Sequence, residues 1–332
     1  MKDVAALARV SLATVSRVVR GEATVDPDLA ERVRRAARAL DYRPNLTASS
    51  LRSSNGRTRT IGLILENVAN PFSSALHRAV EDVARTRGIA VFAGSGDEDP
   101  ERERELALGL VARRVDGLII VPASDDQSYL ANDQQAGLRI VFADRPPQLL
   151  RADAVLSENA DGARRAVVHL AGHGHRRIAF LGNPLRVQTA ADRFAGYRLG
   201  LAEAEIAFDE RLVRTELRGG GVAEAAAAAV VELVDSAQAT ALFASQNLIA
   251  IGAIRALRDL GLQRRIALVG FDDLPLAEFL EPAITVVAQD PAAIGSAACE
   301  LLFQRMDGLD SGPETISIPT RLVLRGSGEI AP

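Results

Sequence analysis

Residues 4–19 read Val4-Ala5-Ala6-Leu7-Ala8-Arg9-Val10-Ser11-Leu12-Ala13-Thr14-Val15-Ser16-Arg17-Val18-Val19, a pattern that predicts two short helices separated by a tight turn at about Arg9–Ser11. Ser11 is a suitable N-cap for the second helix. That helix begins with small side chains, as a helix must if it is to enter the major groove of DNA. The stretch therefore favours a helix-turn-helix, with an ordinary helical hairpin as the alternative.

The second helix carries side chains that suit DNA chemistry. Arg17 can donate two hydrogen bonds to a guanine edge. Leu12 and Ala13 can contact a thymine methyl group, while Thr14 and Ser16 suit phosphates or base edges. We expect this helix to be a recognition helix.

A third helix should complete a small headpiece. Asp26-Pro27 is typical of a helix start, with a capping carboxylate before a proline in the first turn. The apolar positions expected to be buried are Leu29, Val33, Ala37 and Leu40. Three helices in about 45 residues give a small core, so we expect marginal stability.

Charge is divided unevenly along the 332 residues. Residues 1–60 carry twelve Lys and Arg and six Asp and Glu, a net charge of +6. Because the whole chain has a net charge of −4, the remaining residues carry −10. A basic head on an acidic body indicates that only the head meets a polyanion. A solvated helix face with clustered charge is the alternative.

After a polar linker at 49–60, short apolar runs alternate with amphipathic segments. This alternation predicts parallel sheets in α/β units, and about 270 residues suggest two similar lobes. The expected strands are Ile61–Leu65, Ile89–Ala93, Gly117–Val121, Arg139–Ala143, Arg177–Leu181, Thr240–Ala244, Ile266–Gly270 and Ile284–Val287. Helices are expected between most of them, such as Ser73–Arg87, Pro100–Arg113, Ala160–Gly172 and Leu248–Leu260.

The sequence resembles the lac repressor (LacI/GalR) family along essentially its whole length. The resemblance rests on motifs in the expected order: Asp3-Val4-Ala5, Val10-Ser11-x-Ala13-Thr14-Val15-Ser16-Arg17-Val18, Pro44-Asn45-x-x-Ala48-x-x-Leu51, Asn70-Pro71-Phe72, Asp192-Arg193-Phe194, Val269-Gly270-Phe271-Asp272-Asp273 and Gln289-Asp290-Pro291. It implies an all-α headpiece, a hinge helix, and a two-lobed, Rossmann-like core similar to periplasmic binding proteins. We expect a DNA-binding domain at 1–45, a hinge and linker at 46–60, and an effector-binding and dimerisation core at 61–332.

The resemblance also implies roles for headpiece and hinge residues. A homodimer would bind a pseudo-palindromic double-stranded operator, with Leu12, Ala13 and Arg17 facing bases. Thr14, Ser16, Tyr42 and Asn45 would face the DNA backbone or position the helix, and Arg20 can reach a phosphate. Leu51 would be a wedge in the minor groove, a known use of apolar side chains; a dimer contact is its alternative role.

Candidate ligand residues follow the predicted strands, where open α/β sheets bind ligands. They are Asn70-Pro71-Phe72, Gly94-Ser95-Gly96-Asp97, Asp144-Arg145, Gln246-Asn247 and Asp272-Asp273. An aromatic face with amides, carboxylates and a guanidinium suits a sugar or similar polyol. The resemblance adds Arg193 and Gln289, and we expect the effector site to be Phe72, Asp144, Arg145, Arg193, Asn247, Asp272 and Gln289.

Other classes of protein are less well supported. The chain lacks a signal peptide and a transmembrane run, and its single cysteine, Cys299, fits a reducing compartment, so we expect a cytoplasmic protein without membrane contact. A sugar-binding transport protein would need export, and an α/β enzyme would need a nucleophile or nucleotide loop. His169, His173 and His175 read as turn histidines, so we expect no metal site. No nucleotide-binding loop and no nucleophile elbow occur, so we expect no cofactor and no catalytic residue. The sequence does not name the effector.

Overall fold

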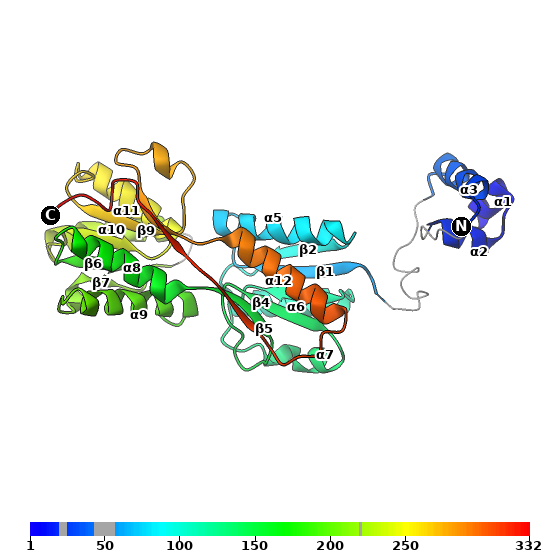
Figure 1. Ribbon diagram of the computed structural model, residues 1–332, viewed down its shortest axis with the longest axis horizontal. Helices are drawn as coiled ribbons and strands as arrows, with labels where there is room; N and C mark the ends of the chain where they lie inside the picture. The colour runs from blue at the N-terminus through cyan, green and yellow to red at the C-terminus, as the bar shows by residue number, and fades with distance from the viewer. Residues whose placement is uncertain (20–24, 43–56, 219–220) are drawn as a thin grey trace. The chain divides into compact units, whose positions relative to one another are not determined.

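The computed structural model describes residues 1–19, 25–42, 57–218 and 221–332 (Figure 1). The chain divides into two compact units, Met1–Thr58 and Arg59–Pro332. Each unit is a separate body with its own core. The predicted roles of Arg20, Asn45 and Leu51 fall outside the described residues.

The first unit contains the three expected helices, α1 (Lys2–Ala8), α2 (Leu12–Val19) and α3 (Pro27–Ala39). The hydroxyl of Ser11 accepts a hydrogen bond from the amide of Thr14 at 3.1 Å. The carboxylate of Asp26 likewise caps α3. Both predicted caps are therefore confirmed, because each satisfies amides that the first turn leaves free.

The headpiece core is smaller than the sequence pattern suggested. Val4, Val15 and Val33 are fully or almost fully buried at its centre. The prediction that Leu40 is buried is wrong, because Leu40 follows the end of α3 and is 44% exposed. The helix instead buries Ala30 and Ala36, so its inward face is one of small residues.

The second unit has two lobes, each built on a six-stranded sheet. Lobe 1 has the order β11-β5-β4-β3-β1-β2, all parallel. Its strands are β1 (Thr60–Leu65), β2 (Ala90–Ser95), β3 (Gly117–Ile120), β4 (Arg139–Ala143), β5 (Asp153–Ser157) and β11 (Thr315–Ile318). Its helices are α5 (Pro71–Thr86), α6 (Pro100–Ala112), α7 (Ala131–Gln135) and α12 (Pro291–Met306), with the 3₁₀ turn η1 (Ser128–Leu130).

Lobe 2 repeats this plan with the order β12-β10-β9-β8-β6-β7. Its strands are β6 (Ile178–Leu181), β7 (Val213–Arg214), β8 (Ala241–Ala244), β9 (Ala267–Phe271), β10 (Thr285–Ala288) and the antiparallel β12 (Arg321–Val323). Its helices are α8 (Asn159–Gly172), α9 (Gln188–Glu203), α10 (Val222–Asp235) and α11 (Asn247–Asp259), with 3₁₀ turns η2 (Glu210–Leu212) and η3 (Ala277–Phe279). The predicted two-lobed parallel α/β core is confirmed.

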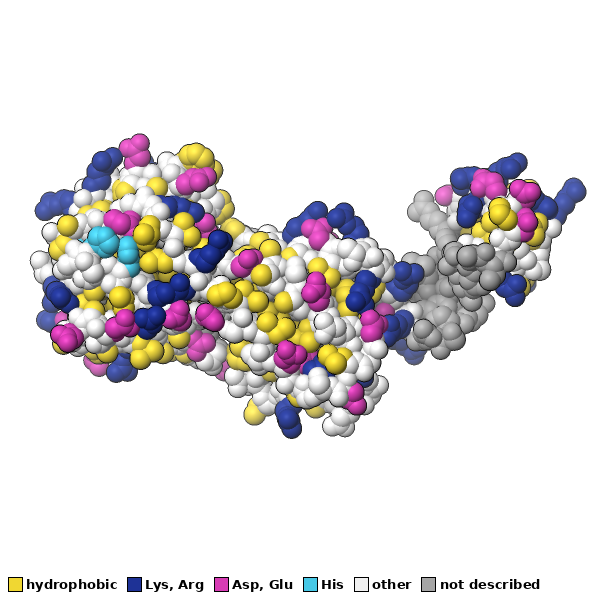
Figure 2. Space-filling model, in the orientation of Figure 1, with side chains coloured by type: hydrophobic (Ala, Val, Ile, Leu, Met, Phe, Trp, Pro, Cys, Tyr) yellow, Lys and Arg dark blue, Asp and Glu magenta, His cyan; other side chains and the backbone are white. Residues whose placement is uncertain are grey.

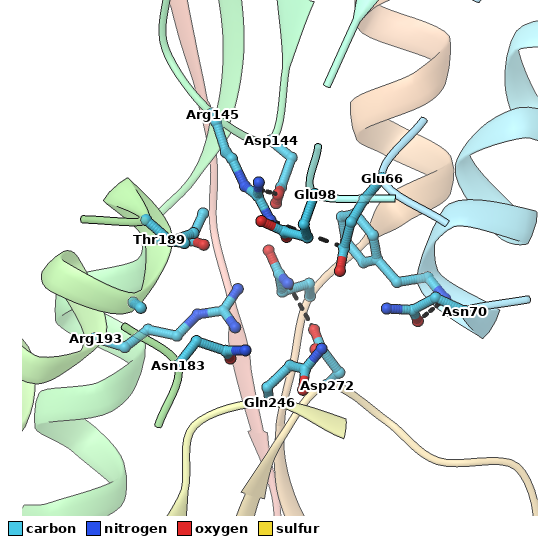
Figure 3. A pocket seen from close by; sticks show the side chains of 14 residues that line it. Glu66, Asn70, Glu98, Asp144, Arg145, Asn183, Thr189, Arg193, Gln246 and Asp272 are labelled. Carbon is cyan, nitrogen blue, oxygen red and sulfur yellow. Dashed lines mark hydrogen bonds and ion pairs between the residues drawn. The ribbon is translucent and has the colours of Figure 1, made fainter. Parts of the chain in front are cut away.

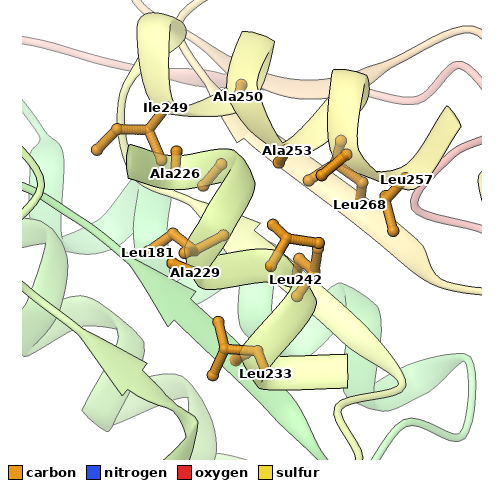
Figure 4. Close-up of a cluster of buried hydrophobic side chains, with 14 of the residues drawn as sticks. Leu181, Ala226, Ala229, Leu233, Leu242, Ile249, Ala250, Ala253, Leu257 and Leu268 are labelled. Carbon is orange, nitrogen blue, oxygen red and sulfur yellow. The ribbon is translucent and has the colours of Figure 1, made fainter. Parts of the chain in front are cut away.

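Hydrophobic burial on the sheet faces holds each lobe together. In Figure 4, Ala226, Ala229 and Leu233 of α10 meet Leu181 and Leu242 of the sheet. Figure 4 also shows α11 packing on the same cluster through Ile249, Ala253 and Leu257. Because side chains on both faces of a parallel sheet are covered by helices, its strands read as continuous apolar runs.

The chain passes between the lobes three times (Figure 1). It crosses from β5 to α8, returns from β10 to α12, and crosses again from β11 to β12. In lobe 1, α12 is tied to β5 by a buried ion pair in which Arg305 Nη2 lies 2.7 Å from Asp153 Oδ1. Three short connections between two rigid lobes form a hinge, with a cleft at the carboxyl ends of both sheets.

His173 and His175 follow α8, as expected for turn residues, whereas His169 lies inside the last turn of the helix and not in the turn. Figure 2 shows histidine side chains gathered on one face of lobe 2. His173 follows the last residue of α8, and His175 Nε2 lies 2.7 Å from the carbonyl oxygen of Ile330. Within residues 1–19, 25–42, 57–218 and 221–332, no cluster of side chains could hold a metal ion. None of the helices in these ranges is long and apolar enough to cross a membrane.

Candidate functional sites: a recognition helix and an interlobe cleft

The outer surface of α2 carries the predicted DNA contacts. Leu12, Ala13 and Arg17 are exposed, whereas Thr14 and Ser16 are half-buried. Thr14 also lies within hydrogen-bonding distance of Ser11, at 2.9 Å between the hydroxyl oxygens. The helix therefore presents one long cation and small apolar groups, a combination that fits base edges.

Two features shape the turn that follows α1. Arg9 adopts a left-handed conformation, φ 52°, at the end of α1 and makes the sharp turn. The guanidinium of Arg32 in α3 donates to the carbonyl oxygen of Ala8 at 2.6 Å and so closes the carboxyl end of α1. Tyr42 packs, half-buried, against the headpiece core, a placement that suits a positioning role.

The second candidate site is a polar cleft between the two lobes (Figure 3). Lobe 1 contributes Glu66, Asn70, Phe72, Glu98, Asp144 and Arg145; lobe 2 contributes Asn183, Val187, Thr189, Ala190, Arg193, Gln246 and Asp272; Gln289 comes from the crossing after β10. Six of the seven predicted effector residues line this cleft. A ligand bound here would contact both lobes at once.

Asn247 is the predicted residue that does not line the cleft. Its side-chain amide instead donates to Asn70 Oδ1 at 2.7 Å, and both residues are almost fully buried. Asn70 in turn caps α5 by accepting from the amide of Phe72. Asn247 therefore links the two lobes and holds the turn that places Phe72, while the neighbouring Gln246 lines the cleft.

Arg145 organises the lobe 1 side of the cleft. Its Nη2 lies 2.6 Å from Glu98 and 3.8 Å from Glu66, and its Nε lies 3.7 Å from Asp144. Burial raises the pKa of Glu66 to about 7, with Glu98 and Asp144 adding to the effect and Arg145 opposing it. Burial also raises the pKa of Asp144, against the attraction of Arg145 and Arg193. The site thus keeps several carboxyl groups close together in a poorly solvated space.

Arg193 and Asp272 organise the lobe 2 side. The guanidinium of Arg193 donates to Asn159 Oδ1 at 2.7 Å and to the carbonyl oxygen of Ser245 at 2.8 Å. It also lies over the ring of Phe271, 4.0 Å from the centroid. Asp272 accepts from Gln289 Nε2 at 2.6 Å. Both side chains are therefore held rigidly before any ligand arrives.

Sequence reasoning missed several lining residues. Glu66 and Asn183 directly follow or nearly follow β1 and β6, so the same strand-end rule could have found them. Thr189 and Ala190 lie in the first turn of α9, away from any strand end, and no local pattern marks them. Asp273, expected beside Asp272, turns away and pairs with Arg325 at 2.6 Å.

A three-helix headpiece whose second helix has the exposed side chains expected of a recognition helix, on a chain whose two-lobed α/β body holds a polar cleft, is typical of a ligand-responsive DNA-binding regulator. Residues 1–45 match the bacterial regulatory proteins of the lacI family, and residues 167–328 match a periplasmic binding protein-like domain. The chain belongs to the lacI family of bacterial transcriptional regulators, as its sequence motifs predicted.

Individual relatives are similar to this protein over almost the whole chain. A ribose operon repressor from Haemophilus influenzae is 31% identical over 98% of both proteins. The solved CelR–cellobiose complex is 31% identical, with a TM-score of 0.72 over 98% of each chain. The lac repressor dimer bound to operator and an anti-inducer is 27% identical, with a TM-score of 0.85 over 98% of each chain. The relatives are transcriptional regulators.

Proposed function

We propose that this regulator is a homodimeric repressor of a pseudo-palindromic operator and that a sugar in the interlobe cleft controls its operator affinity. The observation that carries the proposal is the composition of the cleft, to which both lobes contribute polar side chains around Phe72. A ligand that bridges two hinged lobes stabilises one relative orientation of them. Relatives named for ribose and cellobiose support a sugar as the ligand class.

The proposed contacts on DNA are those of α2 and its neighbours: Leu12, Ala13 and Arg17 on bases, and Thr14, Ser16, Arg20, Tyr42 and Asn45 on or near the backbone, with Leu51 as the minor-groove wedge. The proposed effector contacts are Phe72, Asp144, Arg145, Arg193, Asp272 and Gln289, with Asn247 acting through Asn70. We also propose the division into a DNA-binding domain (1–45), a hinge and linker (46–60) and a core (61–332). The protein would act in the cytoplasm by binding and not by catalysis.

The test is operator affinity, measured by fluorescence anisotropy on a labelled operator with and without sugars such as D-ribose and cellobiose. Coupling between two sites is typically about 1–3 kcal/mol and is reciprocal. An active sugar should therefore shift operator affinity, and operator DNA should shift the affinity for that sugar by the same factor. The proposal is contradicted if no sugar that binds changes the operator affinity and operator DNA changes the affinity for none of these sugars.

A further inference from the structure

The charged groups that line the interlobe cleft are unbalanced. Two guanidinium groups, Arg145 and Arg193, stand among four carboxyl groups, those of Glu66, Glu98, Asp144 and Asp272. Asp144 and Asp272 are each less than 10% exposed, so water screens these charges weakly. The cleft therefore holds more groups that can carry negative charge than groups that carry positive charge.

Most donor nitrogens of the two cleft arginines are already engaged by the protein. Arg145 donates from Nη1 to the carbonyl oxygen of Pro122 at 3.0 Å and from Nη2 to Glu98 at 2.6 Å. Arg193 uses Nε and Nη1 on Asn159 and Ser245, and its face covers the ring of Phe271. These contacts leave two cationic nitrogens that could serve a ligand: Nη2 of Arg193, whose guanidinium Figure 3 shows pointing into the cleft, and Nε of Arg145, which is buried and has no hydrogen-bond partner among the described residues.

Three hydrogen-bond acceptors that line the cleft also lack a partner. Asp144 Oδ1, Gln289 Oε1 and Gln246 Oε1 are buried and have no hydrogen-bond partner within the described part of the chain. The amide of Gln289 cannot turn over to offer its nitrogen, because Nε2 is held by the carboxylate of Asp272. A buried acceptor without a partner costs free energy until a donor reaches it. The cleft is therefore built to receive hydroxyl hydrogens.

From this arrangement we infer, as a refinement that rests on the proposed function, that the cleft selects an uncharged, hydroxyl-rich sugar and rejects phosphorylated and carboxylated forms of the same sugar. The hydroxyl groups of such a sugar donate to the unpartnered oxygens of Asp144 and Gln289, and its ring stacks on Phe72. A phosphate or carboxylate brings no hydrogens for these oxygens and adds negative charge beside four carboxyl groups. Glu66 and Glu98 supply the surplus charge, since Asp144 and Asp272 alone would balance the two arginines.

The test is calorimetric titration of the full chain with matched pairs at pH 8: D-ribose with D-ribose 5-phosphate, D-glucose with D-glucose 6-phosphate and D-gluconate, and D-fructose with D-fructose 6-phosphate. At this pH the phosphates are doubly charged and Glu66 is largely ionised. The uncharged member of at least one pair should bind more tightly, on the order of a hundredfold, because an unpaired buried charge is costly.

Two charge variants sharpen the test. Glu98→Gln removes surplus charge and frees Arg145, so the preference for the uncharged sugar should fall by about tenfold or more. Glu210→Gln removes an exposed carboxylate at the start of η2, just before the edge strand β7 and outside the cleft lining, and should leave the preference unchanged. A charged form that binds as tightly as its parent would overturn the inference and leave the proposed function standing. If no member of any pair binds, the inference fails, and the proposed function is decided by the operator titrations with and without sugars.

Discussion

Asp144 and Asp272 occupy equivalent positions in the two lobes. Each follows the third strand in the order of its sheet, β4 or β9, and each has a left-handed backbone, with φ of 65° and 71°. The amide of Asp144 donates to the carbonyl oxygen of Val155, and that of Asp272 to Val287, both at 2.9 Å. Asp tolerates this conformation better than most residues. The two lobes therefore present matching carboxylates to the cleft.

Asp272→Asn should weaken the binding of an effector sugar without changing operator affinity in its absence. The substitution keeps the shape and the left-handed backbone but removes the charge that accepts from Gln289 at 2.6 Å. Hydrogen bonds to charged groups contribute about 1.5–3 kcal/mol, and a loss of that size is expected in calorimetry. Asp273→Asn is the control, because Asp273 pairs with Arg325. Equal losses of sugar affinity in both variants would show that Asp272 has no specific role in binding the sugar.

Glu66→Gln should change how stability depends on pH. Burial raises the pKa of Glu66 from 4.5 to about 7 in the folded protein, so the unfolded chain releases this proton first. The free energy of unfolding of the wild type should therefore fall as pH rises from about 4.5 to 7. Glutamine cannot ionise, so the variant should gain roughly 1–3 kcal/mol on the wild type between pH 4 and pH 8. Denaturant unfolding at both values measures this; parallel pH profiles would contradict it.

Gly196→Ala should destabilise lobe 2 and disturb Arg193. A methyl group at Gly196 would lie 2.1 Å from the carbonyl oxygen of Ala160, where α9 crosses α8. Forcing helices apart typically costs about 1–3 kcal/mol, and Arg193 lies one helical turn before the glycine. Thermal unfolding and sugar titration should both show a loss. Gly172→Ala is the control, since no atom lies within 4 Å of the added carbon, and it should be nearly neutral.

Arg17→Ala should lower operator affinity by about 1–3 kcal/mol while changing affinity for random DNA much less, because a base contact is specific. Arg38→Ala is the matched control: Arg38 lies in α3, pairs with Glu31 at 2.7 Å, and should affect both DNAs alike. Anisotropy titrations on both DNAs give the comparison. Equal losses on both for Arg17→Ala would make Arg17 a phosphate contact.

The sequence predicted most of the strands, and physical reasons separate those it found from those it missed. All eight predicted strands exist, because runs such as Gly117–Val121 are apolar on both faces. Of the four strands that were missed, β7, β11 and β12 lie at sheet edges, where one side needs no apolar cover; Thr315–Ile318 alternates between exposed and half-buried. Edge strands therefore give weak sequence signals. The fourth, β5, is an interior and mostly buried strand, but it has only five residues and begins with the charged Asp153.

The ligand cleft was predictable where its residues follow strands and not elsewhere. Phe72, Asp144 and Asp272 could be found in this way, and Glu66 obeys the same rule. Arg193 is on a helix and was known only from the family resemblance. Asn247 shows the limit of both approaches, because its bond to Asn70 depends on how two lobes far apart in sequence meet.

The three crossings between the lobes impose an order on biosynthesis. Lobe 1 begins at Thr60, yet its helix α12 and edge strand β11 come after residue 290. At translation rates of about 5–20 residues per second, the chain between β5 and α12 takes roughly 7–27 s to emerge. During that time α5 lacks the helix that packs beside it, and the apolar surface around Leu76 and Val80 has no cover from Ile294 and Ala298. The headpiece, whose contacts are local, can fold at once, so the growing chain acquires its DNA-binding domain well before it can complete the lobe that follows.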